Sequence, residues 1–277
     1  RRAPVDLSNE LGVALEVADA ADAFTLPHFV ERDFTIDWKQ NRTEVTEIDR
    51  RAESLIVERL VDAYPDHGAF GEEHGQAGDA ASAWQWVIDP IDGTSGFVRG
   101  VPVWATLIAL VHEGRPVLGV VSAPALGFRW WGGDTVGARV RSHVGVERDL
   151  QVSQVDSLHD AQVSITHSSG WDALGLTDRL VELQQRARRS RGMGDFWQHM
   201  LVAEGAMDVA VDAIGVAPYD LAAIKPIVEA GGGVFTDRLG RATHEHDSAI
   251  SSNGVLHDQV LAVLGDGVGD APADRLP

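Results

Sequence analysis

The chain has 277 residues, 44% of them hydrophobic, so it can bury a sizeable core and is not a disordered protein. Its 42 acidic residues outnumber 23 Lys and Arg and give a formal net charge of −19, which argues against binding to nucleic acid or to an anionic membrane. The absence of Cys excludes disulfides, thiolate catalysis and cysteine-ligated zinc.

The N-terminal segment predicts neither a secretion signal nor a membrane anchor. Residues 1–4 run directly into an amphipathic pattern, and no apolar run approaches the ~20 residues that span a bilayer. We therefore expect a cytoplasmic protein without a membrane partner. Arg1 is not an initiator Met, which leaves the completeness of the N-terminus open.

The first half of the chain is predicted to be α+β. Apolar residues at helical spacing from Leu7 to Ala21 predict one helix. A second helix is predicted at residues 47–63, where Thr46 and Asp49 have the spacing of a capping box. Predicted strands follow at residues 84–88, 104–111, 116–122 and 128–131, the middle two joined as a hairpin.

The second half is predicted to alternate strands with helices. The strands are expected at residues 163–166, 206–211 and 234–236, and the helices at 174–185, 195–204 and 221–229. Pro226 should kink the last helix, and the glycines at 231–233 should end it. We expect one compact unit with an α+β lobe at 1–150, an α/β lobe at 151–265 and a loose tail at 266–277.

The segment after the strand at 84–88 carries the clearest chemical signal. The strand delivers Asp89, and Pro90 then forces a turn, so that the carboxylate of Asp92 can converge with that of Asp89. Two carboxylates and an intervening backbone carbonyl are ligands that Mg²⁺ prefers. The small residues at 93–96 can open a helix whose free N–H groups bind phosphate. An ordinary turn would explain Asp89-Pro90 alone, but the whole pattern favours a metal and phosphate site.

A further acid, Asp220, precedes an apolar helix. We expect it at the N-cap, where free N–H groups and the helix dipole favour a carboxylate. Capping alone would explain Asp220 if the other motifs were absent.

Four motifs, in order along the chain, resemble those of the inositol monophosphatase superfamily. They are Val45-Thr46-Glu47-Ile48-Asp49, Gly71-Glu72-Glu73, Asp89-Pro90-Ile91-Asp92-Gly93-Thr94, and Tyr219-Asp220-Leu221-Ala222-Ala223 with Glu229-Ala230-Gly231-Gly232 beyond it. The resemblance extends to about Leu264. It implies an α/β (α+β) architecture, the layered αβαβα sugar-phosphatase fold, and an Mg²⁺-dependent phosphatase that acts on a small phosphate monoester, commonly as a homodimer.

The resemblance also implies the metal ligands. Glu72, Asp89 and the carbonyl of Ile91 would hold one Mg²⁺ ion. Asp89, Asp92 and Asp220 would hold a second, and a weaker third ion would lie near Glu72, with Mn²⁺ or Zn²⁺ as possible substitutes. Two metal ions can stabilise the attacking and leaving oxygens of a displacement. We expect Glu73 to be a solvated neighbour or to support the ligands.

The same resemblance implies which residues handle water and phosphate. Asp49 and Thr94 match positions that orient or deprotonate the attacking water, and Glu72 is grouped with them as catalytic. A first-turn helix acid is the other interpretation of Asp49. The N–H groups of Gly93, Thr94 and Ser95 would bind the phosphate oxygens.

Within the superfamily, several segments look most like bacterial histidinol-phosphate phosphatases. They lie at residues 97–104, 122–126, 129–131, 194–196 and 201–205. Because L-histidinol phosphate carries an ammonium and an imidazole, its pocket should offer acids. Asp195 and Asp212 are the candidates, beside Asp92 and Asp220. A helix cap and a turn are the other interpretations of Asp195 and Asp212.

Two departures from the family pattern leave the substrate open. Ser95-Gly96 stands where a larger, often polar pair is usual, and residues 213–218 carry no acid. A third, Tyr219 in place of the usual Trp, is conservative. Inositol 1-phosphate is the alternative substrate, followed by fructose 1,6-bisphosphate or phosphoadenosine phosphate. A second phosphate would need a basic cluster. The chain offers one candidate, formed by Arg186, Arg188, Arg189 and Arg191. A solvated helix end is the other interpretation of these arginines.

Two other classes of function are weaker. A non-catalytic, metal-binding regulatory protein would be favoured by replacement of a metal ligand, and none of the four acids is replaced. A zinc hydrolase would use a polar segment that has no partner motif, and a solvated loop explains it better: His244, Glu245, His246 and Asp247.

Overall fold

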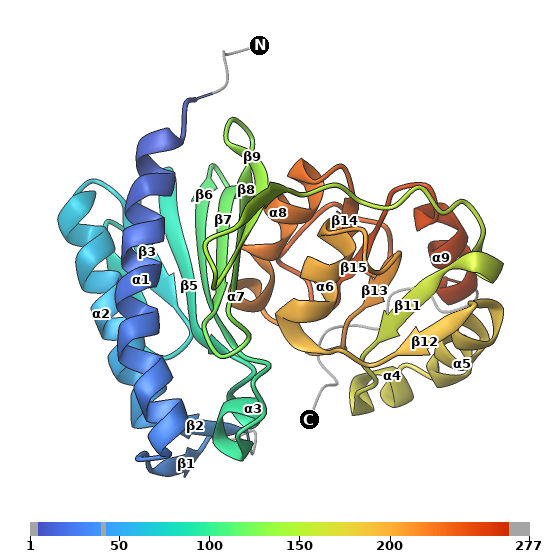
Figure 1. The fold of residues 1–277 in the computed structure, drawn as a ribbon, viewed down its shortest axis with the longest axis horizontal. Helices are drawn as coiled ribbons and strands as arrows, with labels where there is room; N and C mark the ends of the chain where they lie inside the picture. Colours follow the sequence, from blue (N-terminus) through green and yellow to red (C-terminus); the bar gives the residue numbers. More distant parts are fainter. Residues whose placement is uncertain (1–4, 40–42, 266–277) are drawn as a thin grey trace.

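The structure of the chain, a computed structural model, describes residues 5–39 and 43–265. Residues 1–4 and the predicted loose tail at 266–277 lie outside the described residues. Five layers follow one another across the molecule (Figure 1): two helices, an eight-stranded sheet, a helical layer, a five-stranded sheet and an outer group of helices. The predicted αβαβα architecture is therefore confirmed.

The first layer consists of α1 (Ser8–Glu31) and α2 (Glu47–Ala63). The helix predicted to Ala21 continues for ten more residues, although Pro27 lies inside it. Phe24 and Phe29 pack against the buried cluster around Phe97 and Trp104, and this tertiary contact stabilises the extra turns. The predicted capping box of α2 is confirmed, and α2 follows a hairpin of β1 (Ile36–Trp38) and β2 (Glu44–Thr46) that the sequence did not predict.

The eight-stranded sheet has the order β10-β9-β8-β7-β6-β5-β3-β4. Its strands are β3 (Gly68–Gly71), β4 (Gly75–Gly78), β5 (Trp84–Asp92), β6 (Ala105–His112), β7 (Arg115–Ala123), β8 (Phe128–Gly133), β9 (Gly137–Ser142) and β10 (Glu147–Asp149). The four predicted strands, β5 to β8, form its centre. The missed strands are short and rich in Gly or charge, so they carry no apolar alternation of their own.

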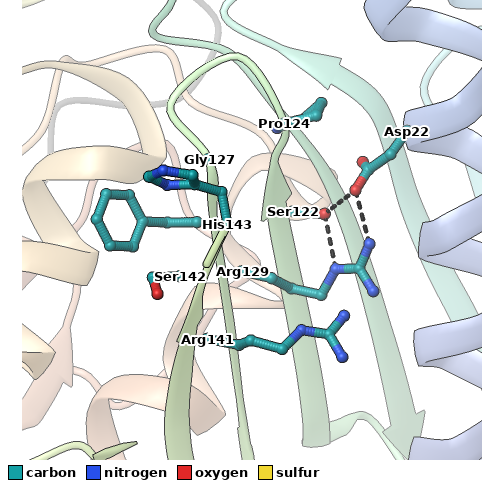
Figure 2. Close-up of a pocket in the computed structure, with 9 residues that line it drawn as sticks. Asp22, Ser122, Pro124, Gly127, Arg129, Arg141, Ser142 and His143 are labelled. Atoms are coloured by element: carbon teal, nitrogen blue, oxygen red, sulfur yellow. Dashed lines mark hydrogen bonds and ion pairs between the residues drawn. The ribbon is translucent and has the colours of Figure 1, made fainter. Parts of the chain in front are cut away.

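A polar network fastens α1 to the sheet (Figure 2). The side chain of Arg129, on β8, is 7% exposed, and its guanidinium lies 2.6 Å from a carboxylate oxygen of Asp22 on α1. It also lies 2.6 Å from a carboxylate oxygen of Asp19 on the same helix. Its Nε donates to Ser122 on β7, whose hydroxyl donates to Asp22. Burial raises the pKa of Asp22 despite the positive charge of Arg129. The network links one helix to two strands.

The middle layer contains α6 (Asp195–Ala203), α7 (Pro218–Leu221) and α8 (Ile224–Ala230). The helix predicted at 221–229 is interrupted: α7 ends at Leu221, Ala222 and Ala223 keep right-handed helical backbone angles, and α8 begins at Ile224. Pro226 has no N–H to donate to the carbonyl oxygen of Ala222, so the interruption expected from Pro226 lies at this junction. A Cβ at Gly119 of β7 would lie 2.0 Å from the carbonyl oxygen of Ala223, so glycine permits the α7–α8 junction to contact the sheet closely.

The second sheet has the order β12-β11-β13-β15-β14. It consists of β11 (Gln162–Ile165), β12 (Arg189–Arg191), β13 (Val209–Val211), β14 (Val234–Thr236) and β15 (Ile250–Ser252). The outer helices are α4 (Ser169–Ala173), α5 (Thr177–Arg186) and α9 (His257–Leu264). The helix predicted at 174–185 begins only at Thr177, because Gly175 has a φ of 69° and separates α5 from α4.

Within the described ranges, we find no helix with the length and apolar character needed to cross a membrane.

Candidate active site

Asp89 and Asp92 meet at an irregularity near the end of β5. In a regular strand, residues three apart point to opposite faces. The pairing of β5 with β6 shifts register between Asp89 and Asp92, which allows both carboxylates to reach the same side. The turn expected from Pro90 is therefore a break in register inside the strand. An additional hydrogen bond, from the N–H of Ile91 to Oδ1 of Asp89 at 3.0 Å, braces it.

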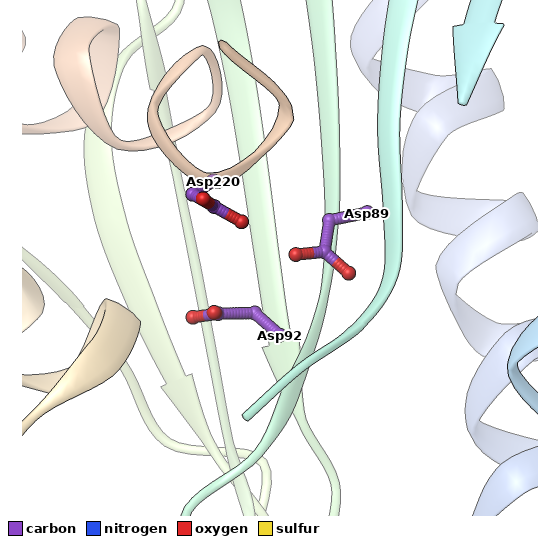
Figure 3. A group of neighbouring side chains, drawn as sticks. All are labelled: Asp89, Asp92 and Asp220. Carbon is purple, nitrogen blue, oxygen red and sulfur yellow. The ribbon is translucent and has the colours of Figure 1, made fainter. Parts of the chain in front are cut away.

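Asp220 completes a group of three carboxylates. Asp89, Asp92 and Asp220 each offer an oxygen within 4.8 Å of those of the other two, and they point toward one another from β5 and α7 (Figure 3). The predicted N-cap position of Asp220 is wrong. Asp220 is the third residue of α7, and its side chain accepts a hydrogen bond of 2.7 Å from the N–H of Ala217, the true N-cap. The helix start still orients the carboxylate, but from inside the first turn.

The crowding of these acids raises their pKa values. Burial raises the pKa of Asp89 well above its usual range, and the charges of Glu72, Asp92 and Asp220 raise it further. Burial likewise raises the pKa of Asp220 to about 7. A buried all-oxygen cluster with this much unbalanced negative charge fits a hard divalent cation such as Mg²⁺, which would supply the missing positive charge.

Glu72 reaches the cluster from the neighbouring strand. The parallel pairing of β3 and β5 ends with Gly71 opposite Ile88, so Glu72 leaves the sheet beside Asp89. Burial raises the pKa of Glu72, although the hydrogen bond and the positive charge of Lys39 lower it. Glu72 does not belong to the tight group of three carboxylates. The structure thus places it at the edge of the predicted metal site.

The ammonium group of Lys39 lies between two acids at this edge. Its Nζ is 2.7 Å from Oε1 of Glu72 and 2.6 Å from Oε1 of Glu73. Burial by itself would lower the pKa of Lys39, but the two hydrogen-bonded carboxylates raise it. The Glu73 side chain is 5% exposed, so the expectation of a solvated neighbour is wrong, and its ion pair with Lys39 explains its burial. Sequence reasoning missed Lys39, which lies in no recognised motif.

Asp49 and Thr94, 45 residues apart, are in contact. The hydroxyl of Thr94 lies 3.0 Å from Oδ1 of Asp49 and 3.0 Å from the carbonyl oxygen of Ile91. The other oxygen of Asp49 accepts from the N–H of Thr46 at 2.8 Å, as the capping box requires. Burial raises the pKa of Asp49, while its hydrogen bonds lower it. The helix-cap and catalytic interpretations of Asp49 are therefore compatible, because each uses a different oxygen.

The predicted phosphate loop opens a short helix. Gly93 is the N-cap of α3 (Thr94–Arg99) and has a φ of 86°. A Cβ there would also lie 2.8 Å from the carbonyl oxygen of Val103, so glycine is needed for both reasons. The first-turn N–H groups of α3, including those of Thr94 and Ser95, have no intrahelical partners and can receive an anion.

The four predicted substrate-binding acids line one cavity. It has a volume of about 120 Å³, and its lining includes Asp92, Asp195, Asp212 and Asp220. Asp195 and Asp212 come from the C-terminal half of the chain and share this cavity with two acids of the carboxylate cluster. Burial, followed by the charge of Asp212, raises the pKa of Asp195 to about 6. The cavity is thus acidic and adjoins the carboxylate cluster.

Asp212 is held by a histidine that sequence reasoning missed. His199, on α6, is fully buried, and its Nε2 lies 2.9 Å from Oδ2 of Asp212. Its Nδ1 lies 2.7 Å from the hydroxyl of Ser251. With the Ser251 hydroxyl donating to Nδ1, the proton of Nε2 faces Asp212. A possible sequence signal was the adjacent polar pair Gln198-His199 inside an otherwise apolar helix.

The polar segment considered for zinc forms no metal group with its neighbours. In the described part of the chain, the group able to hold a metal ion is the one formed by Asp89, Asp92 and Asp220. Glu245 is exposed, as expected for a solvated loop, but His244 is 5% exposed, so the loop is solvated only in part. His246 contacts the buried carboxylate of Asp237 instead.

Comparisons with known proteins show which family the chain belongs to. Residues 6–267 match the Inositol monophosphatase family. A histidinol-phosphatase of Streptomyces coelicolor is 44% identical over 263 residues, which cover 94% of this chain and 98% of that protein. A histidinol-phosphatase of Mycobacterium tuberculosis is 44% identical over 259 residues, 94% of this chain and 99% of that one. A Thermotoga maritima IMPase structure matches with a TM-score of 0.81 and 30% identity, covering 93% of this chain and 97% of that one.

The fold, the acidic site and these similarities together define the class of protein: it is a phosphoric monoester hydrolase. The chain belongs to the inositol monophosphatase family, whose members are metal-dependent and act on small phosphate esters.

Proposed function

We propose that the protein hydrolyses L-histidinol phosphate to L-histidinol and inorganic phosphate with Mg²⁺ as cofactor, as in histidine biosynthesis. The observation that carries this proposal is the acidic cavity beside the carboxylate cluster, where Asp195 and Asp212 face Asp92 and Asp220. A substrate with an ammonium group and an imidazole suits such a cavity, because the ammonium and the protonated imidazole each balance buried negative charge. The similarity to two histidinol-phosphatases supports the same choice.

In this proposal the metal site consists of Glu72, Asp89, Asp92, Asp220 and the carbonyl of Ile91. Bound Mg²⁺ would lower the pKa of a coordinated water and balance charge on the phosphate oxygens. Two or three ions could bind, and Mn²⁺ or Zn²⁺ could replace Mg²⁺. The raised pKa values of Asp89 and Asp220 support the assignment, because burial and neighbouring acids leave these carboxyls in need of a cation.

Thr94 and Asp49 would handle the proton of the attacking water. The Thr94 hydroxyl can donate to Oδ1 of Asp49 at 3.0 Å, which leaves its oxygen free to accept a hydrogen bond from the water. The proton can then pass to the carboxylate of Asp49, whose pKa is raised by burial. This route assigns a role to each residue of the contact.

The phosphate would lie at the start of α3. The backbone N–H groups of Gly93, Thr94 and Ser95 are the proposed donors to its oxygens. The remaining part of the substrate would extend into the cavity toward Asp195 and Asp212, and its ammonium would lie between these two carboxylates. The bond from His199 to Asp212 keeps that acceptor in place.

Inositol 1-phosphate remains the alternative substrate, which the similarity to a Thermotoga maritima IMPase favours. Fructose 1,6-bisphosphate and phosphoadenosine phosphate are weaker alternatives. Both need a second phosphate site, and the lining of the acidic cavity contains no arginine among the described residues. Arg186 of the basic cluster is paired with Glu182, and Arg189 and Arg191 are exposed on β12.

Phosphate release from a panel of esters tests the proposal. The panel contains L-histidinol phosphate, inositol 1-phosphate, fructose 1,6-bisphosphate and phosphoadenosine phosphate, each with and without Mg²⁺. We expect Mg²⁺-dependent release with a strong preference for L-histidinol phosphate, and loss of that release in Asp92→Asn. Preference for inositol 1-phosphate would overturn the substrate and keep the metal site. No release from any ester would favour the non-catalytic, metal-binding alternative.

We also propose that the protein is a cytoplasmic homodimer with two lobes, 1–150 and 151–265, in one cooperative unit. Light scattering coupled to size-exclusion chromatography should give twice the chain mass of 29.8 kDa. Calorimetry should give a single unfolding transition, and two separate transitions would overturn the single unit.

A further inference from the structure

A buried acid outside the recognised site, Glu53, holds the turn that carries Glu72. Glu53 lies on α2 and is 0% exposed. Its Oε2 accepts a hydrogen bond of 2.7 Å from the N–H of Glu73, and its Oε1 accepts one of 2.8 Å from the N–H of His74. Oε1 also lies 3.1 Å from Nδ1 of His74. A fully buried carboxylate is costly unless it is hydrogen-bonded, and these contacts satisfy both oxygens.

Hydrogen bonds thereby fix the backbone on both sides of Glu72. The N–H of Glu72 itself donates to the carbonyl oxygen of Ile88 on β5 at 3.2 Å. The N–H groups of the next two residues, Glu73 and His74, donate to Glu53. The Glu72 backbone is thus held between the sheet and α2, which restricts the directions that its side chain can take.

Gly71 makes this arrangement possible. A Cβ on Gly71 would lie 2.2 Å from Cδ of Glu53, so any larger residue must displace the carboxylate. Displacing the carboxylate would weaken its hydrogen bonds with the N–H groups of Glu73 and His74. The conformation of residues 71–73 therefore depends on the position of the Glu53 side chain.

Glu53 also lies one helical turn after Asp49, on the same face of α2. Asp49 contacts Thr94, and Glu53 contacts the turn after Glu72, so a single rigid helix places two separate parts of the site. Glu53 itself does not line the acidic cavity and belongs to no metal-ligand group of the described residues.

We propose that Glu53 is a positioning residue for the metal site: by holding the N–H groups of Glu73 and His74 it orients Glu72, and so sets the affinity for Mg²⁺ without touching ion or substrate. This inference rests on the proposed role of Glu72 as a metal ligand. Loss of a group that orients a ligand typically weakens metal binding about 10–100-fold.

Calorimetric titration of the full chain with Mg²⁺, without substrate, tests this role. In Glu53→Gln an amide NH₂ must face one of the backbone N–H donors, so we expect the Kd for Mg²⁺ to rise about tenfold. At saturating Mg²⁺, kcat should stay within about threefold of wild type and KM for the ester should not change, because the site is re-formed once the ion is bound. Gly71→Ala should weaken Mg²⁺ binding in the same way with all charges retained.

Two variants of α2 serve as matched controls. Glu58→Gln removes the same charge from an exposed position, and Ile56→Val weakens the buried face of the helix without touching the turn. Both should bind Mg²⁺ like wild type. The proposal is overturned if Glu53→Gln binds Mg²⁺ within about twofold of wild type, or if Ile56→Val weakens binding as much. Absence of Mg²⁺ uptake by the wild-type protein would instead overturn the proposed function, and this inference with it.

Discussion

The backbone N–H of Phe196 donates a hydrogen bond of 2.8 Å to Oδ2 of Asp92, and this bond joins the first turn of α6 to the end of β5. Gly194 and Asp195, which precede Phe196, both have positive φ values, of 76° and 46°. A positive φ is uncommon for a residue with a side chain and is often found at functional sites. Burial and the charges of Asp195 and Asp220 raise the pKa of Asp92 well above its usual range, although this bond by itself lowers it. One carboxylate thus belongs both to the carboxylate cluster of Asp89, Asp92 and Asp220 and to the wall of the acidic cavity.

Asp89→Asn should abolish phosphatase activity and yet stabilise the protein in a chelator. Burial and three neighbouring acids raise the pKa of Asp89, so its ionised form is unfavourable when no metal balances the charge. A neutral amide at this position removes that cost. In EDTA we expect Tm to rise by at least ~2 °C, which corresponds to about 1 kcal/mol for a chain of this size. Addition of Mg²⁺ should stabilise the wild type more than the variant. A lower Tm for Asp89→Asn in EDTA would contradict this account.

Stability in a chelator should depend on pH through Asp220. Its pKa in the folded protein is about 7, above the usual 3.8, so the folded state holds the proton more tightly than the unfolded state. The resulting stabilisation is complete below pH ~4 and is lost as the pH rises to about 7. Urea unfolding in EDTA across this range should show a decline that is smaller in Asp220→Asn. With saturating Mg²⁺ the trend should reverse, since metal binding requires the ionised carboxylates.

Thr94→Val should lower kcat with little change in KM. The substitution keeps the shape of the side chain and removes the hydroxyl that contacts Asp49. The attacking water can then no longer pass its proton through Thr94 to the carboxylate of Asp49. We expect a loss of about 10²–10³-fold in kcat. Thr94→Ser keeps the hydroxyl and is the control, which should retain most of the activity. Equal losses of kcat in Thr94→Val and Thr94→Ser would show that the hydroxyl has no role in the mechanism.

Variants of His199 and Asp212 should separate the substrates. Asp212→Asn removes a proposed acceptor for the ammonium, and His199→Phe removes the buried group that holds Asp212. Loss of a hydrogen bond to a charged group costs about 1.5–3 kcal/mol, so kcat/KM for L-histidinol phosphate should fall at least ~10-fold. Inositol 1-phosphate, which lacks the ammonium, should be less affected. The idea fails if both esters lose activity in equal proportion while the folded state is intact.

Removal of Arg129 should destabilise the packing of α1. In Arg129→Met the buried network loses the cation shared by Asp19 and Asp22, and breaking a buried ion pair from one side costs on the order of 3 kcal/mol. Asp19→Asn is the control: the Asp19 side chain is 65% exposed, and such a pair contributes about 0–1 kcal/mol. Urea unfolding measures both. Similar losses in the two variants would mean that the network contributes no more than a surface pair.

The sequence predicted the elements whose information is local. The capping box of Thr46 and Asp49 was confirmed because a helix start depends on residues three apart. The apolar centre of the large sheet, β5 to β8, was confirmed because each strand carries a continuous apolar run. Asp89 and Asp92 were identified for the same reason: they lie in one short motif beside a buried strand.

Other features depended on contacts between distant residues. The ion pair of Lys39 with Glu72 spans 33 residues, and the bond of His199 to Asp212 joins a helix to the end of a strand.

The sequence by itself therefore determined the family, the layered architecture and the acids of the carboxylate cluster, because these depend on motifs a few residues long. The tertiary structure alone decided which groups support those acids: Glu53 under the Glu72 turn, His199 behind Asp212 and Phe196 against Asp92. The physical reason is that a buried polar group must find its partner wherever the folded chain brings one within hydrogen-bond distance, and that partner has no fixed spacing in the sequence.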